Sequence, residues 1–195
     1  MMLPFKERFR AFLGRMLSVT LGIVITFTVQ GVIDRLRVKN DVRSALELVR
    51  TELSSNLDDI NALSEYLQQE QASARYLARP KKVLAKCPAD SVAYHQGMVN
   101  AYVSAALSHD ALELLNMSTL FPKIADIDLS MKIIRAYDAC DLMVANITRH
   151  IDNRDAQGDG AAEWLVRQVD PSVYTDASDV QAALAAIDAF LSQKP

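Results

Sequence analysis

The 195-residue chain has the composition of a folded protein with one unusual apolar stretch near its N-terminus. Its residues are 50% hydrophobic and 23% charged, which excludes disorder of the whole chain. The net charge is −3, and the Lys and Arg residues crowd around the apolar stretch, which excludes nucleic acid as a partner. Two cysteines, Cys87 and Cys140, are too few for a disulfide scaffold, and whether they pair with each other is open. We therefore expect one ordinary domain plus an appendage.

A basic N-terminal tail, residues 1–15, precedes a segment predicted to cross a membrane, residues 16–33. That segment, MLSVTLGIVITFTVQGVI, contains no charged residue. As an α-helix it is about 27 Å long, close to the roughly 30 Å of hydrocarbon in a bilayer. Arginines on both sides can reach the two headgroup regions: Arg10, Arg15, Arg35 and Arg37. The lipid bilayer is the first partner that the sequence predicts.

Two alternatives compete with a membrane anchor: a cleaved signal peptide and a buried helix of a soluble protein. The basic residues of the tail resemble the charged start of a signal peptide. However, Val29-Gln30-Gly31 is a poor cleavage site, and the helical pattern continues from Asp34 with no proline before Pro80. We therefore favour a single transmembrane helix.

Basic residues flank this helix about equally on both sides, so the distribution of positive charge hardly decides its orientation in the membrane. A short N-terminal tail usually stays in the cytoplasm, and a long following domain crosses the membrane largely regardless of its charge. We expect a protein of the bacterial inner membrane and favour a periplasmic location for its C-terminal domain.

A stripe of small and polar residues recurs at every fourth position of the predicted membrane helix. Its members are Gly14, Ser18, Gly22, Thr26 and Gln30. Small residues in this register let a second helix approach closely, and a glutamine can form a hydrogen bond across the contact. Gly, Ser and Thr are also common in membrane helices that face lipid. The stripe is the candidate transmembrane interface, with another membrane protein or a second copy of the chain as partner.

The membrane helix is expected to continue into a long stalk helix, residues 34–79, that ends at Arg79-Pro80. Apolar residues in steps of three and four form a seam, with Asn56 as its one polar member: Val42, Leu46, Val49, Leu53, Ile60, Leu63 and Leu67. The seam fits a coiled-coil dimer or packing on the chain's own helices. At about 100° per residue, Gly22 points roughly opposite to Leu46. One partner helix cannot easily cover both faces, and we favour packing of the seam within the chain.

Residues 80–195 are predicted to form a small helical domain. A loop should reach about Pro88, and a helix capped by Asp90 or Ser91 should carry Val99, Tyr102, Val103 and Ala106 through Leu115. The next helix should start at Asp126 or Asp128, with a core face of Ile133, Tyr137, Cys140, Val144, Ile147 and Ile151. A turn at residues 153–160 should follow, then a short helix with Trp164 and Leu165. The last helix, capped by Asp176 or Ser178, should bury Val180, Leu184, Ile187 and Leu191. No segment alternates as a strand would, so the predicted fold is an all-α bundle.

The sequence contains no recognisable catalytic or metal-binding motif. Residues 152–163 begin and end with an acid, as a calcium loop does, but Arg154 and Ala156 occupy ligand positions and Gln157 replaces the turn glycine. The three histidines, His95, His109 and His150, are scattered, and we expect them at the surface or in packing contacts. We predict no metal, no cofactor and no enzymatic activity, although catalytic groups can converge in space without a sequence motif.

Two stretches carry a family resemblance. The first runs from LGIVITFTVQGVIDRLR (residues 21–37) into LELVRTELSSNLDDI (46–60), and the second is ALELLNMSTLFPKIADIDLSMKIIRAYDAC (111–140). Together they resemble an uncharacterised family of short bacterial proteins with one membrane helix and a helical domain. The resemblance implies a membrane helix with a basic exit, then a long helix, and it carries no activity or catalytic residues.

The function that we expect is a membrane-anchored, non-enzymatic interaction or accessory subunit of a bacterial envelope complex. The alternative is a sensory domain that binds a small ligand in its bundle and signals through the long helix. A sensor should show a polar group buried in an apolar pocket, whereas an accessory subunit should show an exposed apolar patch.

Overall fold

The computed structural model describes the backbone of residues 5–104, 106–168 and 171–193. Side chains are described for residue 30 and for residues 33–104, 106–168 and 173–193. This described part is predominantly helical and contains no β-strand, which confirms the predicted all-α class. The α-helices are α1 (Phe5–Leu77), α2 (Lys81–Leu84), α3 (Ala89–Val99), α4 (Asp110–Met117), α5 (Ile127–Asp155), α6 (Ala161–Arg167) and α7 (Ser178–Ser192). Three short 3-10 helices join them: η1 (Phe121–Lys123), η2 (Gly158–Gly160) and η3 (Pro171–Tyr174).

The chain divides into two compact units, Met1–Ser44 and Ala45–Pro195. Helix α1 contributes to both, and its residues from Ala45 onward belong with all later elements. We call the second unit the helical unit, and the packing and sites below lie within it. Its stretch of α1 contains neither Gly nor Pro and is rich in Leu, Glu, Gln and Ala, all strong helix formers.

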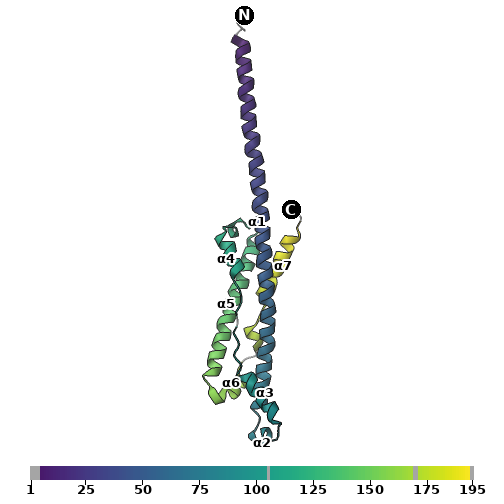
Figure 1. Cartoon of the computed structure of the whole chain (residues 1–195), viewed down its shortest axis with the longest axis vertical. Coiled ribbons are helices and arrows are strands. Elements are labelled where there is room, and N and C mark those ends of the chain that lie inside the picture. Colours follow the sequence, from purple (N-terminus) through teal and green to yellow (C-terminus); the bar gives the residue numbers. More distant parts are fainter. Residues whose placement is uncertain (1–4, 105, 169–170, 194–195) are drawn as a thin grey trace. The chain divides into compact units, whose positions relative to one another are not determined.

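Three long helices form the core of the helical unit (Figure 1). Helix α5 runs parallel to α1, because Glu52 contacts Tyr137 and Glu70, further along α1, contacts Arg154, further along α5. Helix α7 packs along α5 in the opposite direction, and an ion pair between Arg50 and Asp188 joins it to α1. The most deeply buried apolar side chains come from all three helices: Leu46, Val49, Leu53, Ile60, Ile133, Tyr137, Cys140, Ile147, Val180, Ala183 and Ile187.

The seam of α1 is buried within a single copy of the chain. From Leu46 to Leu67 its apolar members are at most 7% exposed, and Asn56 is 1% exposed. The same spacing continues to Glu70 and Ala74, which are also buried. The favoured alternative, in which the chain's own helices cover the seam, is the arrangement observed.

Several predicted helix boundaries agree with the structure. Helix α1 ends at Leu77, close to Pro80, which disfavours a helical conformation in the residue before it. Helix α5 has Asp126 as its N-cap, whose carboxylate accepts a hydrogen bond from the Leu129 amide at 3.0 Å. Ile147 of its predicted core face is buried, whereas Val144 is half-buried.

The predicted helix from Asp90 to Leu115 is wrong in its middle. The structure has α3, then a non-helical segment at residues 100–109, then α4. This segment, which we call the strap, has no regular secondary structure in its described residues and lies beside α1 (Figure 1). Of the residues assigned to that helix, Tyr102 is 81% exposed. Contacts from α1 and α5 to the strap's backbone override its local helical pattern.

Among the described residues, no helix is both long and apolar enough to cross a bilayer. The predicted membrane segment, residues 16–33, lies largely outside the residues whose side chains are described. The same is true of the stripe residues Gly14, Ser18, Gly22 and Thr26. Gln30, the last member of the stripe, is described and exposed.

Candidate functional site

A buried charged cluster joins α1 to the C-terminal half of α5. Glu70 is 1% exposed, and one of its carboxylate oxygens accepts a hydrogen bond from Arg154 Nη1 at 2.7 Å. Its other oxygen lies 2.9 Å from His150 Nε2. His150 and Arg154 are themselves 6% and 2% exposed. Charges this deeply buried require partners of opposite charge, and Glu70 and Arg154 supply them to each other.

Arg154 also holds the start of the strap. Its Nη1 donates to the Ala101 carbonyl oxygen at 2.9 Å, while Nε and Nη2 lie 2.9 and 2.8 Å from Asp155 Oδ1. Burial opposes the charge of Arg154, but Glu70 and Asp155 outweigh it and raise the pKa of Arg154 above its usual value. The hydroxyl of Tyr66 donates to the same Ala101 carbonyl at 3.2 Å. One guanidinium therefore connects α1, α5 and the strap.

Aromatic rings and a second histidine surround this cluster. The His150 ring lies 5.5 Å from the Trp164 ring and 5.7 Å from the Tyr174 ring, between centroids. One turn beyond Glu70, buried Ser73 contacts His95 Nδ1 of α3 at 3.0 Å. Polar contacts one turn apart on α1 thus attach two later helices to it: Glu70 contacts α5, and Ser73 contacts α3.

A second polar cluster lies nearer the N-terminal end of the helical unit. One oxygen of Glu52 accepts a hydrogen bond from Tyr137 Oη at 2.5 Å. The other accepts from Ser108 Oγ at 2.7 Å and from the Ala111 amide at 2.9 Å. The hydrogen bonds from Ser108 and Ala111 place the Glu52 carboxylate at the N-terminus of α4, where free amides and the helix dipole favour negative charge. Glu52 therefore caps a helix far from it in sequence.

The Glu52 cluster shifts two pKa values in opposite directions. Burial alone would raise the pKa of Glu52, but hydrogen bonds from Tyr137, Ala111 and Ser108 lower it below its usual value. Burial and the facing Glu52 carboxylate raise the pKa of Tyr137. Both groups are therefore held in their ordinary neutral-pH states, an ionised carboxylate and a neutral phenol.

Asn56 holds the far end of the strap by its backbone. Its amide nitrogen donates to the Ser108 carbonyl oxygen at 2.9 Å, and its amide oxygen accepts from the Ser108 amide at 2.9 Å. Neighbouring His109 lies 3.0 Å from Asp141 through its Nε2, although that atom makes no hydrogen bond. The pair of bonds that Asn56 makes is the pair that two β-strands exchange. Both backbone polar groups of Ser108 are thus bonded to the side chain of Asn56.

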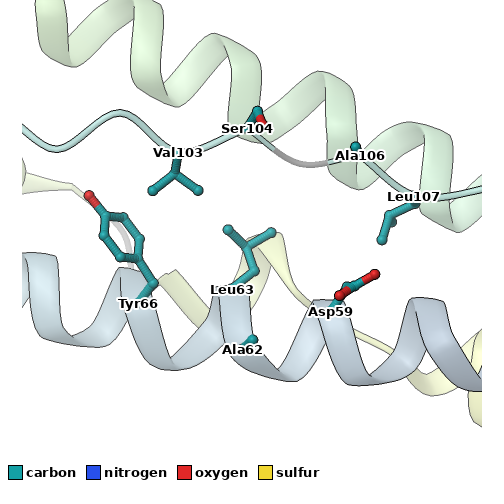
Figure 2. Close-up of a pocket in the computed structure, with 8 residues that line it drawn as sticks. All are labelled: Asp59, Ala62, Leu63, Tyr66, Val103, Ser104, Ala106 and Leu107. Atoms are coloured by element: carbon teal, nitrogen blue, oxygen red, sulfur yellow. The ribbon is translucent and has the colours of Figure 1, made fainter.

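Between its two attachments, the strap and α1 enclose a groove of about 320 Å³. Figure 2 shows Val103 and Leu107 pointing from the strap toward α1, where Leu63 and Tyr66 point back at them. Among the described residues its lining is Asp59, Ala62, Leu63, Tyr66, Val103, Ser104, Ala106 and Leu107. This lining is mainly apolar, with the Asp59 carboxylate at one end.

A larger cleft of about 840 Å³ lies at the opposite end of the helical unit from the Glu52 cluster. One wall comes from the end of α1, α2 and α3: Leu77, Lys81, Leu84, Val92, Gln96, Val99 and Asn100. The other wall comes from the end of α5, η2 and α6: Arg154, Asp155, Gly158, Asp159, Ala161, Ala162 and Glu163. Gly158 has φ 51°, a left-handed conformation that turns the chain between α5 and α6. The cleft is the larger of these two hollows and the more polar in its lining.

The nucleophilic and charged side chains inside the helical unit are engaged or shielded. Glu70 and Arg154 are buried and bonded to each other, and Arg154 also lies in the lining of the large cleft. Cys140 is a free thiol inside the core, and burial raises its pKa to about 11, which keeps it protonated and unreactive. Cys87 is also free, so the structure contains no disulfide between the two.

Sequence reasoning missed both polar clusters. Glu70 follows Leu63 and Leu67 in the spacing of the seam, and His150 and Arg154 follow Ile147 on the core face of α5. Continuing both periodic patterns through these polar residues would have identified them. Neither protein-family models, nor curated proteins, nor solved structures match this chain.

Proposed function

We propose that this chain is a membrane-anchored, non-enzymatic interaction subunit of a bacterial envelope complex, with residues 16–33 as the membrane helix. The uncharged run of residues 16–33 supports the anchor, and burial of the α1 seam within one chain supports the part of the proposal that concerns association. Because α5 and α7 use that surface, a coiled-coil dimer through the seam would require the helical unit to open. The surfaces that remain for binding a partner or a second copy of the chain are then the stripe and the exposed surface of the helical unit.

The groove between α1 and the strap supports a docking role for the helical unit. Tyr66, Val103 and Leu107 of its lining are half-buried, and Tyr102, next to Val103 on the strap, is 81% exposed. Aromatic and aliphatic side chains at the rim of a groove are typical anchors for a partner's side chain. The accessory-subunit alternative predicts such exposed apolar surface.

The alternative function, a sensory domain, is favoured by one observation. The large cleft is lined by Leu77 at the end of α1 and by Arg154, which is buried and bonded to Glu70 of the same helix. A ligand in the cleft would therefore contact the long helix directly. In this alternative, the long helix carries the signal.

Membrane fractionation tests the anchor. The full-length chain should remain in the membrane fraction after washing with carbonate and with high salt, since the uncharged run of residues 16–33 is long enough to span. Recovery of the full-length chain in the soluble fraction would refute the anchor. A mature chain that starts near Val32 would identify a signal peptide instead.

Substitution in the stripe tests the interface. Gly22→Leu should weaken association in the membrane, measured by a transmembrane association reporter, while insertion is kept. The larger side chain preserves hydrophobicity but holds the second backbone away. Leu21→Ile, off the stripe, is the matched control and should leave association unchanged. Equal association of Gly22→Leu and the parent would assign the stripe to lipid and move the search for the partner to the helical unit.

A further inference from the structure

The charges that line the large cleft are separated between its two walls. Among the described residues that line the cleft, carboxylates occur only on the wall formed by the end of α5, η2 and α6: Asp155, Asp159 and Glu163. The facing wall carries a lysine and two amides: Lys81, Gln96 and Asn100. Arg154 also lines the wall that carries the carboxylates, but it is 2% exposed and paired with Glu70 and Asp155. The exposed charges are therefore negative on that wall and positive, with amide groups, on the other.

Three of these charges are not neutralised by the protein. Asp155 is bonded to Arg154, but Asp159, Glu163 and Lys81 have no ion pair within the described residues. Asp159 in η2 and Glu163 in α6 are both exposed carboxylates on the same wall. An ammonium group bound there would form charge-assisted hydrogen bonds with them.

The remaining surface of the cleft is aliphatic. It comes from Leu77, Leu84, Val92, Val99 and Ala161, of which Val99 and Ala161 are buried. The volume of about 840 Å³ lies within the range of small-molecule sites. A ligand with an aliphatic side chain can bury that part here.

We propose that this cleft binds a small zwitterion of the aliphatic amino acid type. Its ammonium group binds Asp159 and Glu163, its carboxylate binds Lys81 with Gln96 or Asn100, and its side chain packs on Leu77 and Leu84, which are half-buried. This site is separate from the stripe and from the groove beside the strap. The proposal does not depend on the proposed membrane interaction.

Two other ligand classes fit the cleft less well. Glu70 and Asp155 already bind Arg154, so a simple anion would have to compete with both carboxylates for it. A metal ion needs several ligands close together, and no group of three or more His, Cys, Asp or Glu side chains in the described part of the chain could hold one. The paired walls match an organic ligand that carries both charges.

Calorimetric titration of the detergent-solubilised full-length protein tests the proposal. The probes are L-leucine, L-valine and L-methionine, each compared with its amide, which lacks the carboxylate, and its deamino acid, which lacks the amine. At least one amino acid should bind saturably, and removing either charged group should weaken binding by about tenfold or more. Absence of binding by all three, or equal binding of the amide and the deamino acid, would overturn the proposal.

Matched variants place the site. The double variant Asp159→Asn with Glu163→Gln, and the single variant Lys81→Met, should each weaken binding by about tenfold or more. All three residues are exposed, so the fold should be kept, which circular dichroism checks. Glu113→Gln changes an exposed carboxylate on α4, outside the cleft lining, and should bind like the parent. Unchanged binding in the cleft variants would refute this site.

Discussion

Asn56 and Glu70 occupy equivalent positions on the buried seam of α1, yet they stabilise different parts of the helical unit. Asn56 is neutral and binds the backbone of Ser108 with two hydrogen bonds. Glu70 is a carboxylate, and it binds two basic side chains, His150 and Arg154, on one helix. A buried amide can pair with any backbone in reach, whereas a buried charge must find an opposite charge. The first fixes where the strap lies, and the second fixes the register of α1 against α5.

The largest expected effect follows from removing Glu70. Glu70→Ala should lower the free energy of unfolding by about 3–5 kcal/mol, because it leaves Arg154 buried without its main counter-charge. Urea denaturation of the parent and the variant, monitored by circular dichroism, measures this difference in the free energy of unfolding. Glu65→Gln, which changes an exposed carboxylate on the same helix, is the control and should have little effect. A loss of less than about 1 kcal/mol would mean that Arg154 turns to water in the variant.

An apolar position on the seam's partner helix provides the reference. Ile147 is 1% exposed, so Ile147→Ala should lower the free energy of unfolding by about 2–5 kcal/mol through lost burial and a cavity. Leu142, on the same helix, is 62% exposed, and Leu142→Ala should change stability little. If thermal melts of the two variants coincided, the assignment of the core face of α5 would be wrong.

A smaller effect is expected at Asn56. Asn56→Ala leaves the Ser108 amide and carbonyl without their partners, and we expect a loss of about 1–3 kcal/mol. Hydrogen exchange should also accelerate at Ser108 more than in α5, because the strap is released first. Asn61→Ala, at an exposed position of α1, is the matched control. Uniform acceleration across the helical unit would show that Asn56 stabilises the whole core and not the strap.

The smallest expected effect concerns Glu52 and pH. Its folded pKa lies below its usual value of 4.5, so its contribution to stability is present above that pH and is lost as the pH falls through the folded pKa. Glu52→Gln should therefore flatten the acid side of the stability profile below about pH 4.5. Stability at several pH values, compared for the parent and the variant, measures it. Parallel profiles would leave Glu52 without a role in acid stability.

Periodicity predicted the parts of the fold in which burial follows the helical repeat. The seam of α1, the core face of α5 and the N-cap at Asp126 were all within reach of the sequence. The strap was not, because its apolar residues also fit a helix and its conformation is set by Asn56 and Arg154, which lie 52 and 53 positions away from the residues they bind. Contacts between residues so far apart in the sequence cannot be predicted from the local residue pattern.

The candidate sites were less predictable than the fold. The stripe at residues 14–30 came from spacing alone, and four of its five members have no described side chain. The cleft is formed by the ends of α1 and α5 with α2, α3 and α6, so its charges converge only in three dimensions. Lys81 and Glu163 are ordinary surface residues in the sequence, and only the packing of distant segments brings them to opposite walls.

The parallel arrangement of α1 and α5 has a consequence for synthesis of the chain. A parallel pair cannot form as a local hairpin, and the Glu70–Arg154 contact closes a loop of 84 residues. Because translation proceeds from the N-terminus, α1 leaves the ribosome with its seam uncovered, and α5 and α7 follow as the last long helices. The α5–α7 hairpin is the most local of the large contacts and should form first, with α1 docking onto it. Until α5 and α7 cover it, the apolar seam of α1 is exposed on the nascent chain. A chaperone would bind the chain during this interval.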